Sequence, residues 1–559
     1  MSKHSSTFTA LRNSTYRRIW LASLLSSVCI GAHDTAATWV MNTLSPSAFL
    51  LSLMSTVASL PFFLFTLPAG ALADMVDRRK LLRFMNLWLA VSAGVLAVLF
   101  GFHLLTPTLI LICVFFTGVG FAFNAPAWAS IVPEIVTNDE LPSASTLSGL
   151  QFNISGIIGP ALGGLALRFV SPSWVFGLNA LCFLVVISAV VKWKRANEGS
   201  KLPLENFLES FATAIRYVRF APGVQVVLVR NILFSLFICV IPALLPVVGL
   251  QKLRFEPSSL GLLFTCMGAG SVFGAVFVVP KLRDHLSSNA IIISASVLLV
   301  AVYLGMALVT DHILFMGIAA VAGIAWTLAA SELWVAGQRA MPDWARGRMN
   351  ATVIMVSQGA MALGGIIWGL SASMLNVTLT LEIAAGLLLL SLLLSIPFSI
   401  NFVGELNFTP APVTGSSLKL LHVPRPHDGP ISITYEFEVH RSRGSEFIRL
   451  LREVRLIHLR NGAYSWRLHE DLGRANVYRI EMMMPSWTEH LLQRERYTKS
   501  ERDVLEQAVA LHAGENPPVE RVYLCVNREL FNHVSLLSHP GTMSTSPLDL
   551  GTQEVGNTV

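Results

Sequence analysis

Twelve apolar stretches, each closed by glycine, proline or charged residues, follow one another between residues 18 and 402. The hydrocarbon core of a bilayer is about 30 Å thick, so a helix needs about 20 apolar residues to cross it. The sequence therefore predicts an all-α membrane part with twelve transmembrane helices in two six-helix bundles. The predicted spans are 18–40, 47–72, 82–103, 107–129, 144–167, 173–191, 224–248, 259–280, 289–309, 313–334, 350–373 and 378–402.

Composition supports a membrane class and divides the chain in two. Hydrophobic residues make up 53% of the sequence and charged residues only 13%, whereas soluble domains carry about 25% charged residues. Of the 40 lysines and arginines, 17 lie in the short segment from residue 410 onward. A soluble domain is therefore predicted after the membrane part. The predicted domains are a six-helix bundle (1–191), a connector with an amphipathic helix (192–223), a second six-helix bundle (224–404), a linker (405–429), a soluble domain (430–530) and a disordered tail (531–559).

The two bundles repeat each other at an offset of about 205 residues. Three glycines of the fifth span, Gly159, Gly163 and Gly164, correspond to Gly364, Gly365 and Gly369 of the eleventh. Many transporters are built from paired repeats with a binding site between them. We therefore expect the substrate-binding site to lie where the two bundles meet.

Basic residues set the orientation. Before residue 410 only Arg168, Lys252 and Arg254 fall on the side opposite the termini. Because lysine and arginine concentrate in cytoplasmic loops, both termini and the soluble domain are predicted to be cytoplasmic. The six cysteines lack metal or redox spacing, and no G-x-x-x-x-G-K-[ST] motif occurs. Neither a metal nor a cofactor is predicted, and an ATP-driven pump is disfavoured.

Asp34 is a carboxylate deep within the first predicted span. Ionisable residues at that depth are costly and usually functional. Helical spacing places Asp34 on one stripe with Ser23, Ser27, Gly31 and Thr38, whereas His33 lies about 100° around the helix. We expect this stripe to border a water-filled cavity, with Asp34 carrying protons or binding substrate. A structural hydrogen bond to a neighbouring helix is the alternative.

Other polar residues within the spans could bind substrate or protons. Glu332 is predicted to pair with Arg339, Arg346 or Arg348, with functional protonation as the alternative. The remaining candidates are Asn124, Gln151, Ser357 and Gln358. Such side chains also join helices to one another within membranes.

The loop between the second and third spans has the sequence Gly70-Ala71-Leu72-Ala73-Asp74-Met75-Val76-Asp77-Arg78-Arg79-Lys80. It resembles the G-x-L-x-D-R-x-G-R-R loop of the major facilitator superfamily, with Met75 and Asp77 replacing the usual Arg and Gly. The resemblance implies a gating role for Gly70, Asp74, Asp77, Arg78 and Arg79. The corresponding second-half loop, 274–284, keeps a degenerate version.

The fifth span contains Gly159-Pro160-Ala161-Leu162-Gly163-Gly164, which resembles the G-P-x-x-G-G core of the superfamily's antiporter motif. Proline loosens the local hydrogen-bond ladder, and small residues allow close helix approach. The segment is therefore either a hinge or a close-packing surface.

Further segments resemble the transmembrane secretion effector branch, which includes siderophore and macrolide efflux proteins. They are Arg216-Tyr217-Val218-Arg219, Ala243-Leu244-Leu245-Pro246, Gln338 and Arg346-Gly347-Arg348. The resemblance implies proton-driven export of a drug-like or siderophore-like molecule across a bacterial inner membrane. The implied partners are membrane lipid, a small organic substrate and protons, and no nucleic acid. A nutrient importer and a membrane-tethered enzyme are the alternatives.

The soluble domain shows a βαββαβ pattern, typical of the ferredoxin-like fold, with its second helix running from Pro485 to about His512. Trp466, Glu481 and the segment Ser486–His490 resemble the dimeric α+β barrel group of monooxygenases and haem-degrading enzymes. Trp487 and His490 are the candidate site residues. No asparagine occupies the expected place on the first strand, so we predict a non-catalytic regulatory or homodimerising module rather than an enzyme.

Overall fold

The computed structural model describes residues 8–137, 139–193, 215–395, 407–412 and 423–525. The chain divides into two compact units, one built from helices α1 to α15 and the other around a β-sheet. Most of the predicted connector helix, much of the linker and the tail after 525 lie outside the described residues. The predicted domain boundaries there remain predictions.

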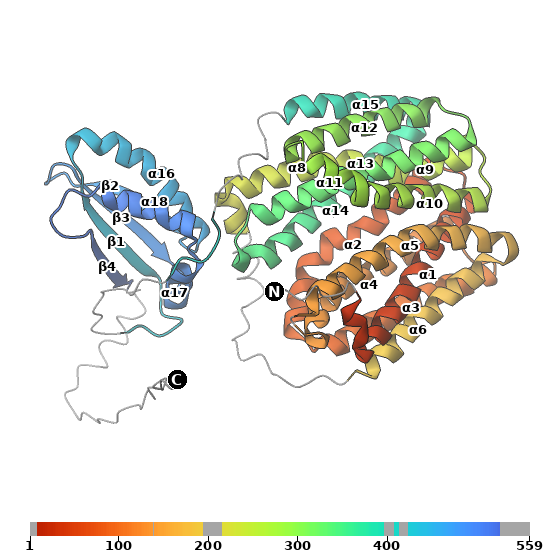
Figure 1. The fold of residues 1–559 in the computed structure, drawn as a ribbon, viewed down its shortest axis with the longest axis horizontal. Helices are drawn as coiled ribbons and strands as arrows, with labels where there is room; N and C mark the ends of the chain where they lie inside the picture. Colours follow the sequence, from red (N-terminus) through yellow and green to blue (C-terminus); the bar gives the residue numbers. More distant parts are fainter. Residues whose placement is uncertain (1–7, 138, 194–214, 396–406, 413–422, 526–559) are drawn as a thin grey trace. The chain divides into compact units, whose positions relative to one another are not determined.

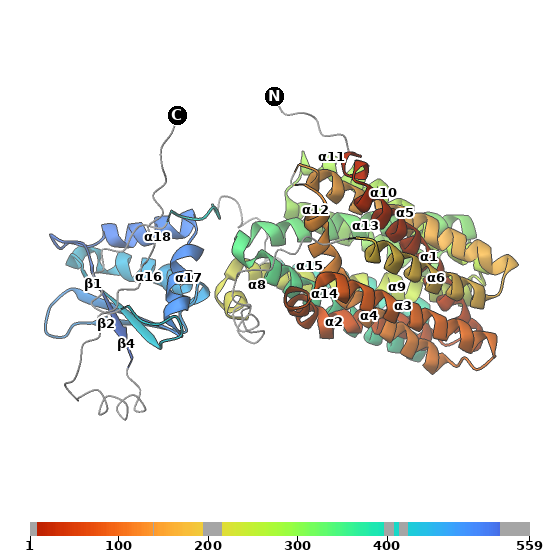
Figure 2. The same cartoon turned by 90° about the horizontal axis from the view of Figure 1, so that it is seen from below.

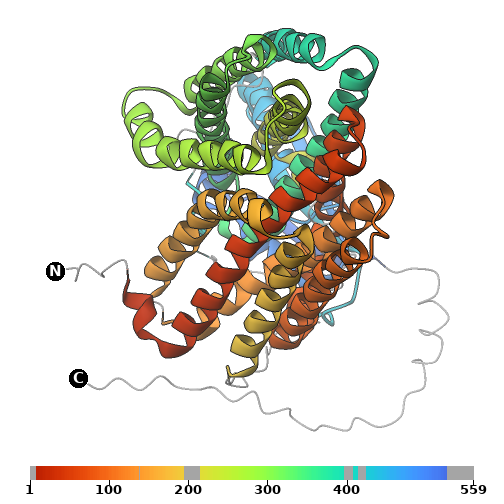
Figure 3. The same cartoon turned by 90° about the vertical axis from the view of Figure 1, so that its right-hand side faces the viewer.

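The helices of the first unit are long, and their bounds follow the predicted apolar stretches. The first half contains α1 (Ser14–Leu44), α2 (Ala48–Met75), α3 (Arg78–Gly101), α4 (Pro107–Ile135), α5 (Leu141–Phe169) and α6 (Pro172–Val191). The second half contains α8 (Pro222–Ile238), α9 (Val240–Val247), the π-turn Val248–Lys252, α10 (Pro257–Phe273), the π-turn Gly274–Val278, α11 (Val279–Arg283), α12 (Ser288–Leu308), α13 (His312–Arg339), α14 (Asp343–Met374) and α15 (Val377–Leu394). Figure 3 shows the two halves as separate groups of helices.

Within the described residues, eleven helical segments are long and apolar enough to cross a membrane. Helix α1 has 31 residues but is not among them. Its length is sufficient, so its polar residues, among them His33 and Asp34, account for the difference. The predicted spans therefore correspond to eleven such segments and one long helix that is less apolar.

Several helices start at residues that favour a helix N-terminus. The side chains of Ser47, Thr106, Ser287 and Asp311 each accept a hydrogen bond from a backbone N–H in the first turn. Proline stands in the first turn of α4, α6, α8 and α10. Proline lacks an N–H and has a fixed φ, so it fits this position without losing an intrahelical bond. The local sequence at these positions therefore specifies where each of these helices begins.

The second unit is a four-stranded sheet with helices on one face, as Figure 2 shows. In chain order the elements are β1 (Ile431–Glu438), α16 (Gly444–Arg460), β2 (Ser465–Glu470), β3 (Val477–Met484), α17 (Trp487–Arg496), α18 (Lys499–Ala510) and β4 (Val519–Leu524). The strand order is β2-β3-β1-β4, and every neighbouring pair is antiparallel. Alternate residues of β1 and β3, such as Phe437 and Ile480, bury against Phe447 and Leu451 of α16.

The single second helix predicted from Pro485 to His512 is wrong, because the structure has two helices there. Helix α17 ends where Tyr497 adopts an extended backbone, with ψ of 132°. The Tyr497 hydroxyl forms a hydrogen bond of 2.9 Å with His458 Nδ1 of α16. Helix α18 then begins at Lys499.

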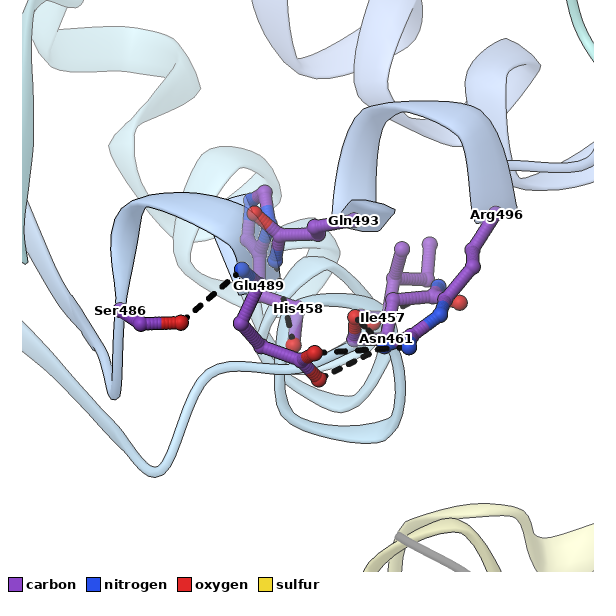
Figure 4. A network of polar contacts seen from close by, with 7 residues as sticks. All are labelled: Ile457, His458, Asn461, Ser486, Glu489, Gln493 and Arg496. Carbon is purple, nitrogen blue, oxygen red and sulfur yellow. Dashed lines mark hydrogen bonds and ion pairs between the residues drawn. The ribbon is translucent and has the colours of Figure 1, made fainter. Parts of the chain in front are cut away.

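A buried polar network joins the end of α16 to α17 (Figure 4). Arg496 donates to the Glu489 carboxylate at 2.7 Å and to the Asn461 carbonyl at 3.2 Å. Gln493 donates to the carbonyl of His458 at 3.3 Å. Because buried polar groups cost free energy unless they are paired, this network fixes α17 against α16.

Acidification should destabilise the second unit through His458. This side chain is only 5% exposed, and burial lowers its pKa to about 4. Below the ordinary value of about 6.5 the unfolded chain binds the proton that the folded chain excludes, so stability falls as pH falls from about 6.5 to about 4. At pH 5 the loss should be roughly 2 kcal/mol of unfolding free energy.

The measurement is calorimetric unfolding of the second unit within the full chain at pH 7 and pH 5. His458→Gln should reduce the difference between the two pH values. His427→Gln, which alters an exposed histidine, should leave the difference unchanged. An equal pH effect in the wild type and in His458→Gln would contradict the assignment.

Candidate transport pathway

The two halves of the first unit meet through backbone-to-backbone contacts between α5 and α10. A methyl group built on Gly164 would lie 2.7 Å from the Cα of Gly261, and one on Gly261 would lie 2.8 Å from the Cα of Gly164. The Thr265 hydroxyl donates across the same contact to the carbonyl of Ile157 at 3.0 Å. Only glycine allows helices to approach this closely.

Helices α2 and α14 form the second contact between the halves. A methyl group on Gly369 would lie 2.8 Å from the Cβ of Ser52. The Thr56 hydroxyl donates to the carbonyl of Ala362 at 3.1 Å, and the Ser52 hydroxyl donates to the carbonyl of Ala243 in α9 at 3.1 Å. Small residues and hydroxyl-to-backbone bonds therefore join this pair as well.

Two of the three repeated glycine pairs occupy equivalent places in the two halves, whereas Gly163 packs against Ala32 of its own half and Gly365 against Thr56 of the opposite half. Gly159 packs against α1, where a built methyl would lie 2.9 Å from the Cα of Gly31, and Gly364 packs against α8 at the carbonyl of Leu236. Gly164 and Gly369 both face the opposite half. In each half, one helix (α5 or α14) therefore uses one glycine to pack against a helix of its own half and another to pack against a helix of the opposite half.

These contacts lie at the ends of the helices remote from the basic loops. They involve the first half of α2, the second halves of α5 and α14 and the first half of α10. Toward the basic loops, Phe152 of α5 is 79% exposed and Phe277, just after α10, is 54% exposed. The described contacts therefore close the halves at the end away from the basic loops.

The residues of the predicted polar stripe on α1 differ in their surroundings, and the role of the stripe stays a prediction. The Gln151 amide of α5 donates to the Ser27 hydroxyl at 2.8 Å. Asp34 is exposed, and no hydrogen bond or ion pair to its carboxylate occurs among the described residues. His33 is buried and meets the ring of Phe176 edge-on at 4.8 Å. Ser23, however, is buried and does not share the exposure of Asp34.

Three further candidates are half-buried on α4 and α14. The Ser357 hydroxyl donates to the carbonyl of Val353 in its own helix at 2.8 Å. For the side chains of Asn124 and Gln358, no hydrogen-bond partner occurs within the described part of the chain. Both side-chain amides can therefore form hydrogen bonds with a ligand without losing a hydrogen bond within the described part of the chain.

The predicted partners of Glu332 are wrong. Its carboxylate, 1% exposed, receives a bond of 2.6 Å from Nε of Arg283. Arg283 ends α11, which continues α10 through a π-turn and so runs beside α13. The sequence did not reveal this pair because the 274–283 segment is helical rather than a loop.

Residues of the 70–80 segment, between α2 and α3, form polar contacts with helices α4 and α6. Asp77, where the superfamily usually has glycine, caps α3 by accepting bonds from the N–H groups of Arg79 and Lys80. Arg78 forms an ion pair of 2.8 Å with Glu134 of α4. Arg79 donates to the carbonyls of Val190 and Val191 at the end of α6. Gly70 lies within α2, with open space beside it, and the side chain of Asp74 lies outside the described residues.

In the second unit, Trp487 and His490 share a face of α17, as predicted. Both are buried, with ring centroids 5.1 Å apart, and Nδ1 of His490 has no hydrogen-bond partner among the described residues. Burial, together with the nearby Arg494 charge, lowers the pKa of His490 to about 4.

Sequence reasoning missed Arg230, a buried arginine within a membrane-spanning helix. It lies in α8, is 4% exposed and donates to Asn289 Oδ1 at 2.6 Å. The sequence signal that could have identified Arg230 is a charged residue within the seventh predicted span, 224–248.

The fold, with two repeated halves that meet at the contacts of α5 with α10 and of α2 with α14, defines a multi-pass membrane transporter rather than an enzyme. A family model described as transmembrane secretion effector matches residues 5–530, which includes most of both units. The chain belongs to this family of the major facilitator superfamily.

Curated relatives are efflux proteins. The chain is 24% identical to the multidrug efflux pump Tap of Mycolicibacterium fortuitum over 68% of this chain and 92% of that protein. It is 23% identical to the enterobactin exporter EntS of Shigella boydii over 68% and 90%. It is 21% identical to macrolide efflux protein A of Streptococcus pyogenes over 51% and 71%.

Solved structures share the fold. A bacterial homologue of the human lysosomal transporter Spinster, in an inward-facing and unoccupied conformation, has a TM-score of 0.56 and 12% identity over 70% of this chain and 97% of that chain. The nucleoside transporter NupG has a TM-score of 0.54 and 12% identity over 68% and 98%.

A side chain at Gly164 should hold the halves apart. In Gly164→Leu, the added atoms would overlap the backbone of Gly261, so α5 and α10 should separate by about 2 Å. Spin labels at Phe169 and Glu256, both exposed near this contact, would report the change as a longer distance. Gly177→Leu, on α6 with open space beside it, should leave the distance unchanged. An unaltered distance in Gly164→Leu would count against the contact.

Proposed function

We propose that this protein is a proton-coupled secondary transporter that exports a drug-like or siderophore-like organic molecule from the cytoplasm by alternating access. The observation that carries the proposal is Asp34, a carboxylate in α1 that is exposed and unpaired among the described residues of a major facilitator fold. The names of the relatives, which include a macrolide efflux protein, a multidrug pump and a siderophore exporter, support the direction and the substrate class.

The proposed topology has twelve transmembrane helices, with α1 as the first. Its polar residues lower its hydropathy below that of the other spans, and a helix that borders a water-filled pathway can tolerate them. Both termini, the basic loops and the second unit would then be on the cytoplasmic side of a bacterial inner membrane, in agreement with the positive-inside rule. The contacts between the halves would correspondingly close the periplasmic end.

Asp34 is the better candidate for the proton carrier than Glu332. The Glu332 carboxylate is buried and already bound by Arg283 at 2.6 Å, so this pair would have to break before Glu332 could bind another partner. Asp34 has no such partner among the described residues, so its charge can be neutralised by a proton or by a cationic substrate. The Ser27–Gln151 pair, Asn124, Ser357 and Gln358 would supply hydrogen bonds to substrate along the same pathway.

The loop 70–80 and the glycines of α5 would control the change of state. Arg78 and Arg79 link the start of α3 to α4 and α6, so these helices can move as one body. The segment Gly159–Gly164, which contains Pro160, contacts α1 and α10 at once. A small bend there would change the contact between the halves.

The second unit would have the ferredoxin-like plan and a regulatory or homodimerising role. Its helices cover one face of the sheet. The other face carries Ser432, Glu481 and His469, with Glu481 accepting from Ser432 at 3.2 Å and lying 3.4 Å from His469. A polar sheet face of this kind suits a second copy better than it suits a lipid surface.

Asp34→Asn should abolish energised efflux. The amide keeps the size of the carboxylate and resembles its neutral form but cannot exchange a proton, so coupling fails although the protein remains in the membrane. Efflux is measured as intracellular accumulation of a panel of macrolides and siderophores in cells with and without the protein. Asp34→Glu should retain part of the activity, and Asp139→Asn, at an exposed carboxylate outside both gating-type loops, should retain all of it.

Normal efflux by Asp34→Asn would remove Asp34 as the proton carrier. Inside-out vesicles test the direction independently: uptake driven by a proton gradient supports export, whereas uptake only by right-side-out vesicles supports a nutrient importer.

A further inference from the structure

A cavity in the second half contains a buried arginine that is only partly paired. The polar residues that line this cavity are Arg230, Ser296, Ser391 and Ser395. Its walls come from helices α8, α12 and α15. Figure 1 shows α12 and α15 on the side of the second half away from α1–α6, so this cavity is separate from the proposed pathway.

Arg230 is the only charged residue that lines the cavity, and one of its donors is free. The residue is 4% exposed, and its Nη2 donates to Asn289 Oδ1 at 2.6 Å. Its buried Nε has no hydrogen-bond partner, and no carboxylate lies within ion-pair distance of it, among the residues the structure describes. A buried guanidinium without a counter-charge is costly, which points to an anionic ligand.

The depth of the cavity matches the head-group region of a bilayer. Asn289 is the second residue of α12, Ser395 directly follows the end of α15, and Arg230 is in the third turn of α8. The same ends of these helices adjoin the basic segment Lys281–Arg283. The guanidinium therefore lies close to the membrane surface on the side of the basic loops.

The lining matches the chemistry of a lipid head-group. A guanidinium can donate two parallel bonds to a phosphate. The three serine hydroxyls now donate to carbonyls of their own helices at 2.7 to 2.9 Å, and rotation would direct them to a phosphate oxygen. Leu233, Phe234, Ile292, Leu388 and Leu392 supply an apolar wall for the glycerol and the first acyl carbons.

We propose that this cavity binds the phosphate group of an anionic phospholipid from the leaflet beside the basic loops, with Arg230 as the main phosphate ligand. Basic pockets between transmembrane helices on this side are suited to anionic head-groups. Lipid is favoured over free phosphate because most of the lining is apolar. The proposal is independent of the transport direction and of the role of Asp34.

The test is native mass spectrometry of the delipidated full-length protein, titrated with phosphatidylglycerol, phosphatidylcholine or inorganic phosphate. The wild type should bind one phosphatidylglycerol roughly tenfold more tightly than phosphatidylcholine. Arg230→Gln should lose roughly that factor. The control Arg219→Gln removes an exposed arginine shortly before α8 and should bind like the wild type. Equal phosphatidylglycerol binding by the wild type and Arg230→Gln would overturn the proposal.

Two further arms separate the remaining outcomes. Inorganic phosphate at millimolar concentration should not displace the lipid, and full displacement would assign the cavity to free phosphate instead. Ser391→Leu keeps the charge and fills the cavity, so it should also lose phosphatidylglycerol. If Arg230→Gln does not fold, retained binding by Ser391→Leu overturns the proposal and lost binding supports it.

Discussion

The close approach of glycine backbones between the halves is the constraint on which the rest of the membrane unit depends. Lipid tails are as apolar as leucine, so helices in a bilayer associate through van der Waals packing and short-range hydrogen bonds rather than through the hydrophobic effect. Gly164 on Gly261 and Gly369 on Ser52 supply that packing across the molecule. Such a contact is strong only when it is fully made, because a small gap loses much of the dispersion energy. A contact of this kind suits the proposed alternating access, in which the halves would be either in full contact or apart.

Three ionisable residues within the spans illustrate three ways of tolerating charge in a membrane. Glu332 is buried against Arg283. Arg230 lies in a cavity beside the bilayer surface, with one amide partner. Asp34 is left exposed, with no partner for its carboxylate in the described part of the chain. The first arrangement holds two helices together. The second leaves a donor for the proposed lipid phosphate, and the third leaves an acid for the proposed exchange of a proton.

Much of this architecture could be predicted from the sequence because apolar length is a local property. The helix starts at Pro107, Pro172 and Pro222 and the glycine repeat needed no knowledge of tertiary structure. The four strands of the second unit and the helix between the first two followed from periodicity in the same way. The side-chain pairs between helices could not be predicted in this way. The pairs Glu332 with Arg283 and Ser27 with Gln151 depend on which helices are neighbours and on how each helix is rotated about its axis. The break at Tyr497 was missed because the hydroxyl bond that accompanies it reaches a distant histidine, His458.

The two ion pairs near the basic loops explain how each half can keep its shape while the contact between halves changes. Arg78 with Glu134 links the start of α3 to α4, and Arg283 with Glu332 links the end of α11 to α13. Both pairs lie within a half and none of their members crosses to the other. In the second pair the carboxylate is 1% exposed, whereas the Arg283 side chain is 43% exposed. Solvent screens a pair with an exposed partner, so this pair contributes less to stability than a fully buried pair would. In the proposed alternating-access cycle, the contacts between the halves would change while each of these pairs stays within its own half.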